Sequence, residues 1–161
     1  MAINYKQFVE KVSTLAILLS VVFLALEVSQ SNQLAKSTIR QALNVSDMEL
    51  WKIMLEEDVI AKSLFKIDNN LKLTKYEEYQ VELFQTVNFR DYDNSFYHYS
   101  NGLFEEDVWL MYRKGIKQLL LRDLSARKMW EKHNSEFSNE FQIEVNKIIN
   151  ELKVELNEII D

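Results

Sequence analysis

The stretch VEKVSTLAILLSVVFLALEVSQSNQ, residues 9–33, decides how this chain is organised. Residues 12–26 carry no charge, and Glu27 then ends the apolar run. An α-helix of that length is about 22 Å long, whereas the hydrocarbon core of a bilayer is about 30 Å thick. Extended to residues 8–28, the helix is long enough to span, with Lys11 and Glu27 near its ends at the depth of the headgroups. We therefore expect one membrane-spanning helix.

Two alternatives to a span stay open at this point. A cleaved signal peptide has a similar apolar length, although the residues after Leu24 offer no convincing small-x-small cleavage site. A core helix of a soluble bundle would have to be buried on all sides, which a chain of 161 residues hardly provides. The span is therefore the preferred interpretation.

The composition favours an all-α fold. The chain has no proline and two glycines, Gly102 and Gly115, whereas proteins average about 5% proline and 7% glycine. So few helix breakers favour long helices over a turn-rich β fold. The lack of cysteine excludes a disulfide framework, thiolate catalysis and cysteine-based metal sites. A net charge of −6 argues against a nucleic acid partner, because phosphate binding needs a basic surface.

The sequence predicts two parts. Residues 1–44 form the membrane-spanning helix and a polar stalk, because no proline or glycine interrupts VSQSNQLAKSTIRQALN after Glu27. Residues 45–161 form a soluble α-helical bundle that ends in an amphipathic helix. Ser46 and Glu49 have capping-box spacing and predict that a new helix begins there.

Local motifs predict the ends of the longest helix in the bundle. Thr74 and Glu77 have the spacing of a capping box at its start, and Asn101 with Gly102 is a typical C-terminal end. The stretches EEDVWLMYRKGIKQLLL and SARKMWEKHN predict two more helices after it. The bundle is therefore expected to consist of several helices joined by short connections.

Two sets of large apolar side chains are candidates for packing surfaces. The first set is expected to pack in the core rather than form a belt at the membrane interface, and consists of Trp51, Trp109 and Trp130. The second set is a stripe at nearly heptad spacing on the last helix, made of Phe141, Val145, Ile148, Leu152, Leu156 and Ile159. This stripe predicts either oligomerisation or packing back onto the same domain, and the residues favour neither.

The stretch RDYDNSFYHY, which begins at Arg90, is the richest polar and aromatic cluster. On a helix, Asp91, Asn94 and His98 share one face, which is typical of a pocket wall or a pore lining with a titrating histidine. The favoured interpretation is a central bundle helix, in which the aromatic residues face the core and Arg90 is satisfied by Asp93 or Asn94.

Catalytic, cofactor and metal motifs are missing from the sequence. Phe96 occupies the position where a calcium-binding loop starting at Asp91 needs glycine. Neither His98 nor His133 follows a glutamate by three residues, so the pattern of a carboxylate-bridged di-metal site is not met. We therefore expect no enzyme activity, no cofactor and no bound metal.

Three stretches, FLALEVSQSNQLAKSTIRQ, YHYSNGLFEEDVW and RKMWEKHNSEFSNEFQ, resemble in their order a widespread family of small, uncharacterised bacterial proteins. Its members have a short N-terminus, one apolar helix, a Gln/Asn-rich exit and a compact helical domain. The resemblance covers roughly residues 12–145 and implies membrane anchoring and a helical domain, without implying any site residues. This chain departs from the usual pattern of the family in having Glu27 close to the exit of the apolar helix.

The sequence thus predicts a non-enzymatic, single-span protein of a bacterial inner membrane. We expect it to act as an interaction, scaffold or regulatory subunit, either as a homo-oligomer or within a larger membrane complex. Basic residues flank both ends of the span almost equally, and we expect the soluble domain to be cytoplasmic. The alternative is an oligomeric pore or a ligand-sensing membrane effector, whose pore or helix-packing face consists of Ser13, Ser20 and Glu27.

Overall fold

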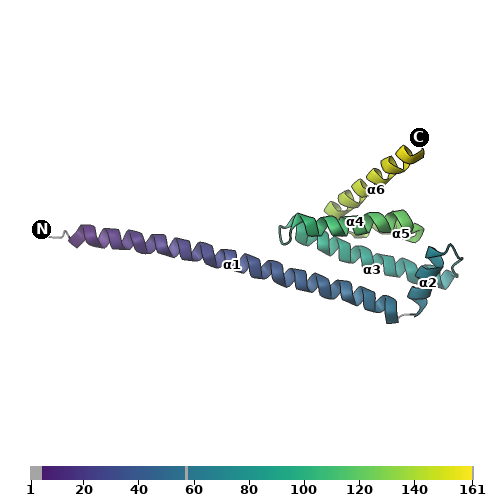
Figure 1. Ribbon diagram of the computed structural model, residues 1–161, viewed down its shortest axis with the longest axis horizontal. Helices are drawn as coiled ribbons and strands as arrows, with labels where there is room; N and C mark the ends of the chain where they lie inside the picture. Colours follow the sequence, from purple (N-terminus) through teal and green to yellow (C-terminus); the bar gives the residue numbers. More distant parts are fainter. Residues whose placement is uncertain (1–4, 57, 161) are drawn as a thin grey trace. The chain divides into compact units, whose positions relative to one another are not determined.

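The computed structural model describes residues 5–56 and 58–160, with side chains up to residue 155. All regular secondary structure in these residues is helical (Figure 1). The elements are, in order, α1 (Tyr5–Glu56), α2 (Asp58–Asp68), α3 (Lys75–Ser100), α4 (Glu106–Arg122), α5 (Leu124–His133), the 3-10 helix η1 (Asn134–Glu136) and α6 (Asn139–Ile160). These described residues contain no strand, so the all-α fold predicted from the lack of helix breakers is confirmed.

Helix α1 continues without interruption through the polar stretch that follows the apolar run. The predicted helix start at Ser46 is wrong, because Ser46 lies inside α1 and its Oγ donates a hydrogen bond to Asp91 Oδ1 at 2.5 Å. A capping residue needs non-helical backbone, and the sequence around Ser46 has no proline or glycine to interrupt the helix. The hydroxyl therefore serves a contact with α3 instead of a cap.

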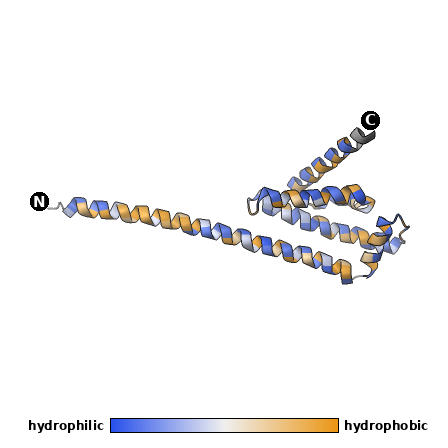
Figure 2. Ribbon diagram, viewed as in Figure 1, coloured by the Kyte–Doolittle hydropathy of each residue, from blue (hydrophilic) through white to orange (hydrophobic). Residues whose placement is uncertain are grey.

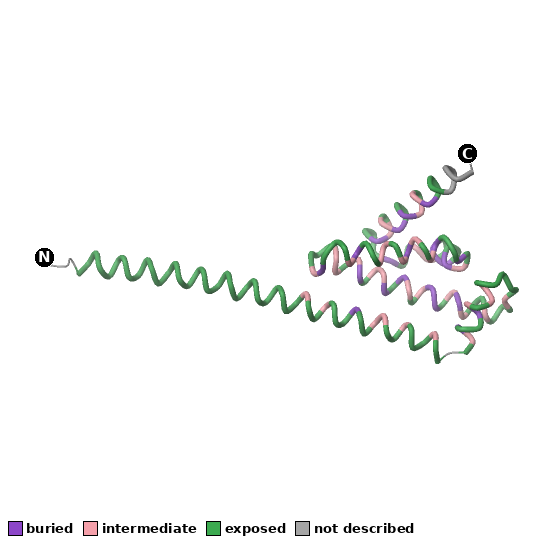
Figure 3. Tube along the Cα trace, viewed as in Figure 1, coloured by how far each residue is buried: buried purple, intermediate pink, exposed green. Residues whose placement is uncertain are grey.

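The chain divides into two compact units, Met1–Thr38 and Ile39–Asp161, and the division falls within α1. The apolar run belongs to the first unit and appears as the orange section of α1 in Figure 2. It includes an 18-residue window long and apolar enough to cross a membrane, of which no residue is buried (Figure 3). The window therefore lacks the burial that a core helix of a soluble bundle would have.

Aromatic rings form the centre of the second unit, which we call the helical domain. Trp130 of α5 stacks on Phe89 of α3, with ring centroids 5.2 Å apart, and meets Phe141 of α6 edge-on at 5.8 Å. All three side chains are almost completely excluded from solvent, and such ring pairs stabilise a core beyond the burial of their area. Smaller buried side chains from α4, α5 and α6 complete the same cluster, among them Ile116, Leu120, Met129 and Val145.

The predicted burial of the tryptophans is confirmed for Trp109 and Trp130 and is wrong for Trp51, which is 60% exposed. Helix α1 contributes one buried residue, Leu43, to the core cluster. Trp51 lines an open pocket of the helical domain and lies outside the packed core, so its ring stays largely in solvent.

The helix ends predicted from local motifs are confirmed for α3. Glu77 N donates to Thr74 Oγ1 at 3.3 Å, and Thr74 N donates to Glu77 Oε2 at 2.8 Å, which completes the capping box. The hydrogen bond from Lys66 and these capping bonds lower the pKa of Glu77 to about 2. At the other end of α3, Gly102 adopts a φ of 69° and its N–H donates to the oxygen of Tyr99 at 2.8 Å.

The apolar stripe of α6 packs onto its own domain in the part whose side chains are described. Phe141, Val145 and Ile148 are fully buried there. Leu152 is 8% exposed, and Leu156 and Ile159 lie outside the described side chains. The first four residues of the stripe are therefore core residues and are not available for oligomerisation, because α3, α4 and α5 already cover them.

Charged side chains flank this packed stripe. Arg113 of α4 donates from Nε to Glu144 Oε1 at 2.7 Å and from Nη2 to Glu151 Oε1 at 2.7 Å. The Arg113 side chain is 19% exposed, so these pairs are partly shielded from water. The hydrogen bond with Glu151 raises the pKa of Arg113 and lowers the pKa of Glu151. The two bonds fix the direction in which α6 crosses α4.

Replacing Ile148 with alanine is expected to destabilise the helical domain by about 2–5 kcal/mol, because it leaves a cavity in the core. The matched control is Ile143→Ala on the same helix, where the side chain is 71% exposed and the change stays within about 0.5 kcal/mol. Urea unfolding of the full chain in detergent, followed by circular dichroism, measures both. Equal losses at the two positions would contradict the burial of the stripe.

Candidate functional site

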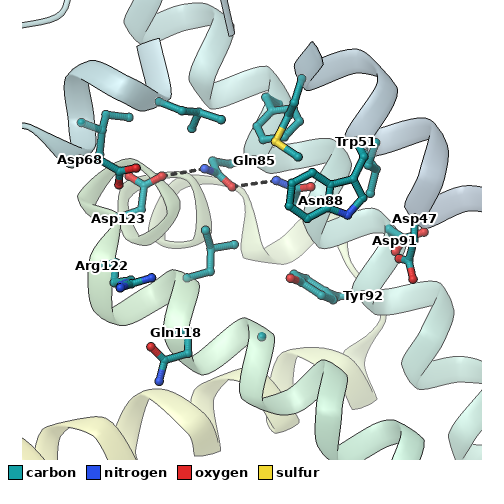
Figure 4. A pocket seen from close by; sticks show the side chains of 17 residues that line it. Asp47, Trp51, Asp68, Gln85, Asn88, Asp91, Tyr92, Gln118, Arg122 and Asp123 are labelled. Carbon is teal, nitrogen blue, oxygen red and sulfur yellow. Dashed lines mark hydrogen bonds between the residues drawn. The ribbon is translucent and has the colours of Figure 1, made fainter. Parts of the chain in front are cut away.

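A pocket of about 550 Å³ opens in the helical domain, between the last turns of α1 and helices α2, α3 and α4 (Figure 4). Helix α1 contributes Asp47 and Trp51 to its wall, α3 contributes Gln85 and Tyr92, and α4 contributes Leu119. Aromatic and aliphatic walls with a few amide and carboxyl groups are typical of sites for small molecules. This pocket is therefore a candidate binding site for a small molecule.

The amide groups at one end of the pocket are satisfied by the fold itself. Gln85, which is 1% exposed, donates from Nε2 to Asp123 Oδ2 at 2.7 Å and accepts a bond from Asn88 Nδ2 at 3.1 Å (Figure 4). The other carboxyl oxygen of Asp123 accepts the main-chain N–H of Ser125 at 2.8 Å and caps α5. This end of the pocket joins α3 to the corner between α4 and α5.

Two aspartates meet at the opposite end, and we call Asp47 and Asp91 the carboxyl pair. Figure 4 shows their side chains next to one another, Asp47 on α1 and Asp91 on α3. Ser46 Oγ donates to Asp91 Oδ1 at 2.5 Å, and Tyr112 Oη of α4 donates to Asp47 Oδ2 at 3.0 Å. Side chains from three helices thus converge on the pair.

The surroundings of Asp47 raise the pKa of its carboxyl group. Burial raises the pKa of Asp47 above its ordinary 3.8, and the neighbouring Asp91 carboxyl raises it further. Burial and the two carboxylates raise the pKa of Tyr92 to about 12, and burial raises that of Tyr112 as well. Two like charges close together are unfavourable, so the neighbouring carboxyl group of Asp91 favours the protonated form of Asp47.

The chemistry open to these residues is hydrogen bonding and proton exchange. The carboxyl pair connects α1 to α3 and α4, next to the buried side chain of Leu43. Within the described part of the chain, no group of three or more histidine, aspartate or glutamate side chains is placed to hold a metal ion. The pair therefore acts first as an attachment for α1.

Arg90 of the predicted polar cluster has a different partner from the one expected. Its Nη1 donates to the main-chain oxygen of Glu136 at 2.6 Å, and its guanidinium carbon lies 4.6 Å from the centre of the Phe137 ring. Asp93 instead accepts the main-chain N–H of Ser138 at 3.1 Å. The expected bond to Asp93 or Asn94 is replaced because the segment after α5 lies against this part of α3.

The other members of the predicted cluster have different surroundings along α3. Asp91 is buried and accepts the bond from Ser46, whereas Asn94 is exposed. His98 is half-buried beside Tyr97, and its Nδ1 has no hydrogen-bond partner among the described residues. Helical spacing places residues on one side of α3, but the neighbouring helices decide which of them are covered. Whether the cluster has a function stays a prediction.

The residues that sequence reasoning missed are Asp47 and Tyr112, which lie 65 positions apart. No local spacing connects them, because their contact depends on how α1 packs against α4. Of the predicted pore or helix-packing face, Ser13, Ser20 and Glu27 are all exposed, and Ser20 Oγ donates to the main-chain oxygen of Ala16 at 2.8 Å. The role of that face stays a prediction.

Replacing Asp47 with asparagine is expected to make the helical domain less sensitive to pH. Because folding raises the pKa of Asp47, its favourable contribution is complete below about pH 3.8 and is lost as the pH rises through the folded value. Asparagine still accepts the Tyr112 bond and carries no charge, so the melting temperature of the variant should exceed that of the wild type increasingly from pH 4 to 7.

The control is Asp58→Asn, whose carboxylate is exposed and pairs with Lys62. Exposed pairs of this kind contribute little, so its melting temperature should follow the wild type at every pH. If Asp47→Asn and the wild type show parallel pH profiles, folding does not raise the pKa of Asp47.

Comparison of the chain with models of protein families, with curated proteins and with solved structures found no match in any of the three. The resemblance to small membrane-anchored bacterial proteins therefore stays a prediction.

Proposed function

We propose that this protein is a single-span membrane protein whose helical domain is an interaction or regulatory module at the membrane surface. The apolar window of α1, of which nothing is buried, is the observation that carries the proposal. Side chains such as Phe23 and Ile17 are 71% and 65% exposed. Exposed apolar area is unfavourable in water by about 25 cal/mol per Å², and a bilayer removes it from water.

The setting that we propose is a bacterial inner membrane with the helical domain in the cytoplasm. The resemblance to small bacterial membrane-anchored proteins supports the membrane. Lys6 and Lys11 precede the apolar run and Lys36 and Arg40 follow it, so basic charge is nearly balanced across it.

The helical domain is proposed to act by binding and not by catalysis. Its surface keeps large apolar side chains exposed, and Val45, Met48 and Leu55 gather along one face of α1. Exposed apolar side chains that gather in patches are typical of protein contact surfaces. The polar groups around the pocket are meanwhile engaged in holding helices together, as the bonds of Gln85 and Asp47 illustrate. A partner in a larger membrane complex, or a second copy, is the kind of ligand that such a surface favours.

Two arginines in the apolar window are expected to release the protein from the membrane. Each arginine near the centre of a spanning helix costs about 2.5–3.5 kcal/mol, so Leu19→Arg with Val22→Arg should shift the protein to the soluble fraction after carbonate extraction. The matched control is Leu34→Arg with Ser37→Arg, at the same spacing in the polar stretch of α1. Extraction of the wild type by carbonate would contradict the anchor.

The pocket supports a second candidate, a ligand-sensing membrane effector. Its volume of about 550 Å³ suits a small organic molecule, and its wall joins α1 to the rest of the helical domain. A molecule bound there would contact Trp51 of α1 and Leu119 of α4 together. Occupancy of the pocket would then change how firmly α1 is attached.

Native mass spectrometry of the gently solubilised protein tests this candidate. We expect an additional bound mass that is lost in Leu119→Trp, which fills the pocket, and is kept in Leu110→Trp on the exposed side of the same helix. If the wild type and both variants show only the mass of the protein, with nothing bound, ligand sensing is contradicted. The experiment also reports how many copies of the chain associate.

A further inference from the structure

The part of α1 within the helical domain has two apolar faces. One face carries Leu43, which is buried in the core, and the carboxyl-pair residue Asp47. The other face carries Val45, Met48 and Leu55, which are 54%, 68% and 83% exposed. At 100° per residue, Met48 and Leu55 lie on the side of the helix away from Leu43. The second face is therefore not needed for attaching α1 to its own domain.

The exposed face has the spacing of a coiled coil. Its residues follow one another at intervals of four, three, four and three, and we call them the outer row: Gln41, Val45, Met48, Lys52 and Leu55. Such alternation keeps one side of a helix turned towards a partner helix. Three of the five side chains are apolar, which matches the requirement of the seam of a helix pair.

The polar members of the outer row favour a second copy over an unrelated helix. Lys52 lies between Glu49 and Glu56 in the sequence, so two identical helices side by side offer each lysine a carboxylate of the other chain. Within one chain, Lys52 Nζ lies 3.9 Å from Glu56 Oε1 in an exposed ion pair, whose side chains are 67% and 65% exposed. A single lysine in such a seam also specifies register, at some loss of stability.

We propose that the outer row is a self-association surface, which pairs in parallel with the outer row of a second copy of this chain. The proposal rests on the proposed membrane anchor, because copies anchored through the same segment enter the bilayer in the same direction. Residues 41–55 span about 22 Å, or two heptads, which is short for a coiled coil in free solution. Confinement to a membrane raises the effective concentration of the copies and offsets that shortness.

The chain offers a clean background for disulfide trapping, because it contains no cysteine. Met48→Cys and Leu55→Cys place a thiol in the outer row, and Ala42→Cys places one on another exposed side of the same helix. After mild oxidation of native membranes, Met48→Cys and Leu55→Cys should give disulfide-linked dimers several-fold more abundant than Ala42→Cys. Adding Met48→Glu to Leu55→Cys should reduce the dimer several-fold.

Carbonate extraction of the same membranes tests the anchor, whereas disulfide trapping tests the pairing, so the two proposals can fail separately. Membrane-bound protein with no dimer, or with as much dimer from Ala42→Cys as from Met48→Cys, overturns the pairing and leaves the anchor in place. Protein released by carbonate overturns the anchor, and with it the reason for parallel pairing. Circular dichroism of each variant shows that the loss of dimer is not a loss of folding.

Discussion

Packing of aromatic rings around Trp130 is the interaction on which the helical domain depends. Its indole stacks on Phe89 of α3 and meets Phe141 of α6, so one side chain of a ten-residue helix joins three helices. A helix as short as α5 is marginal by itself and gains its stability from such packing. With α3 fixed in this way, Asp91, two residues after Phe89, is held on another side of α3, where Ser46 reaches it.

The contacts that attach α1 to the helical domain differ from those that hold the core together. Whereas α5 and α6 are held by buried rings and aliphatic side chains, α1 contributes one buried side chain, Leu43, and the partly buried Ile39, together with the hydrogen bonds of Ser46 and Asp47. Hydrogen bonds between polar side chains contribute about 1 kcal/mol each, much less than a buried aromatic ring. In the ligand-sensing function proposed above, a molecule in the adjoining pocket would act on this attachment. That is why the regulatory function proposed for the helical domain centres on α1.

Helix α1 also faces three environments along its length. Its apolar run is exposed over the whole window, its later turns pack on the helical domain through one face, and the outer row leaves a second face apolar. A soluble helix with two apolar faces is unusual unless a partner covers one of them. The same helix would thus combine an anchor, an attachment and a pairing surface, each served by different residues.

The sequence by itself determined the helical class, the capping box at Thr74 and Glu77, the stop at Gly102 and the apolar run. These features depend on residues close together in the chain, where backbone preference and spacing decide. Tertiary structure alone decided that Ile148 is buried, that Trp51 is exposed and that Arg90 bonds to Glu136.

The capping motif at Ser46 shows why a prediction from local sequence can differ from the tertiary structure. Its spacing is that of a helix start, yet the serine lies inside α1 because nothing in the chain interrupts the helix there and Asp91 offers its hydroxyl a partner. Asp47 and Tyr112 likewise meet across 65 residues. The spacing of nearby residues predicts where one helix begins and ends. Which residue of another helix a side chain contacts depends on how whole helices pack, and this packing is determined by residues throughout the core.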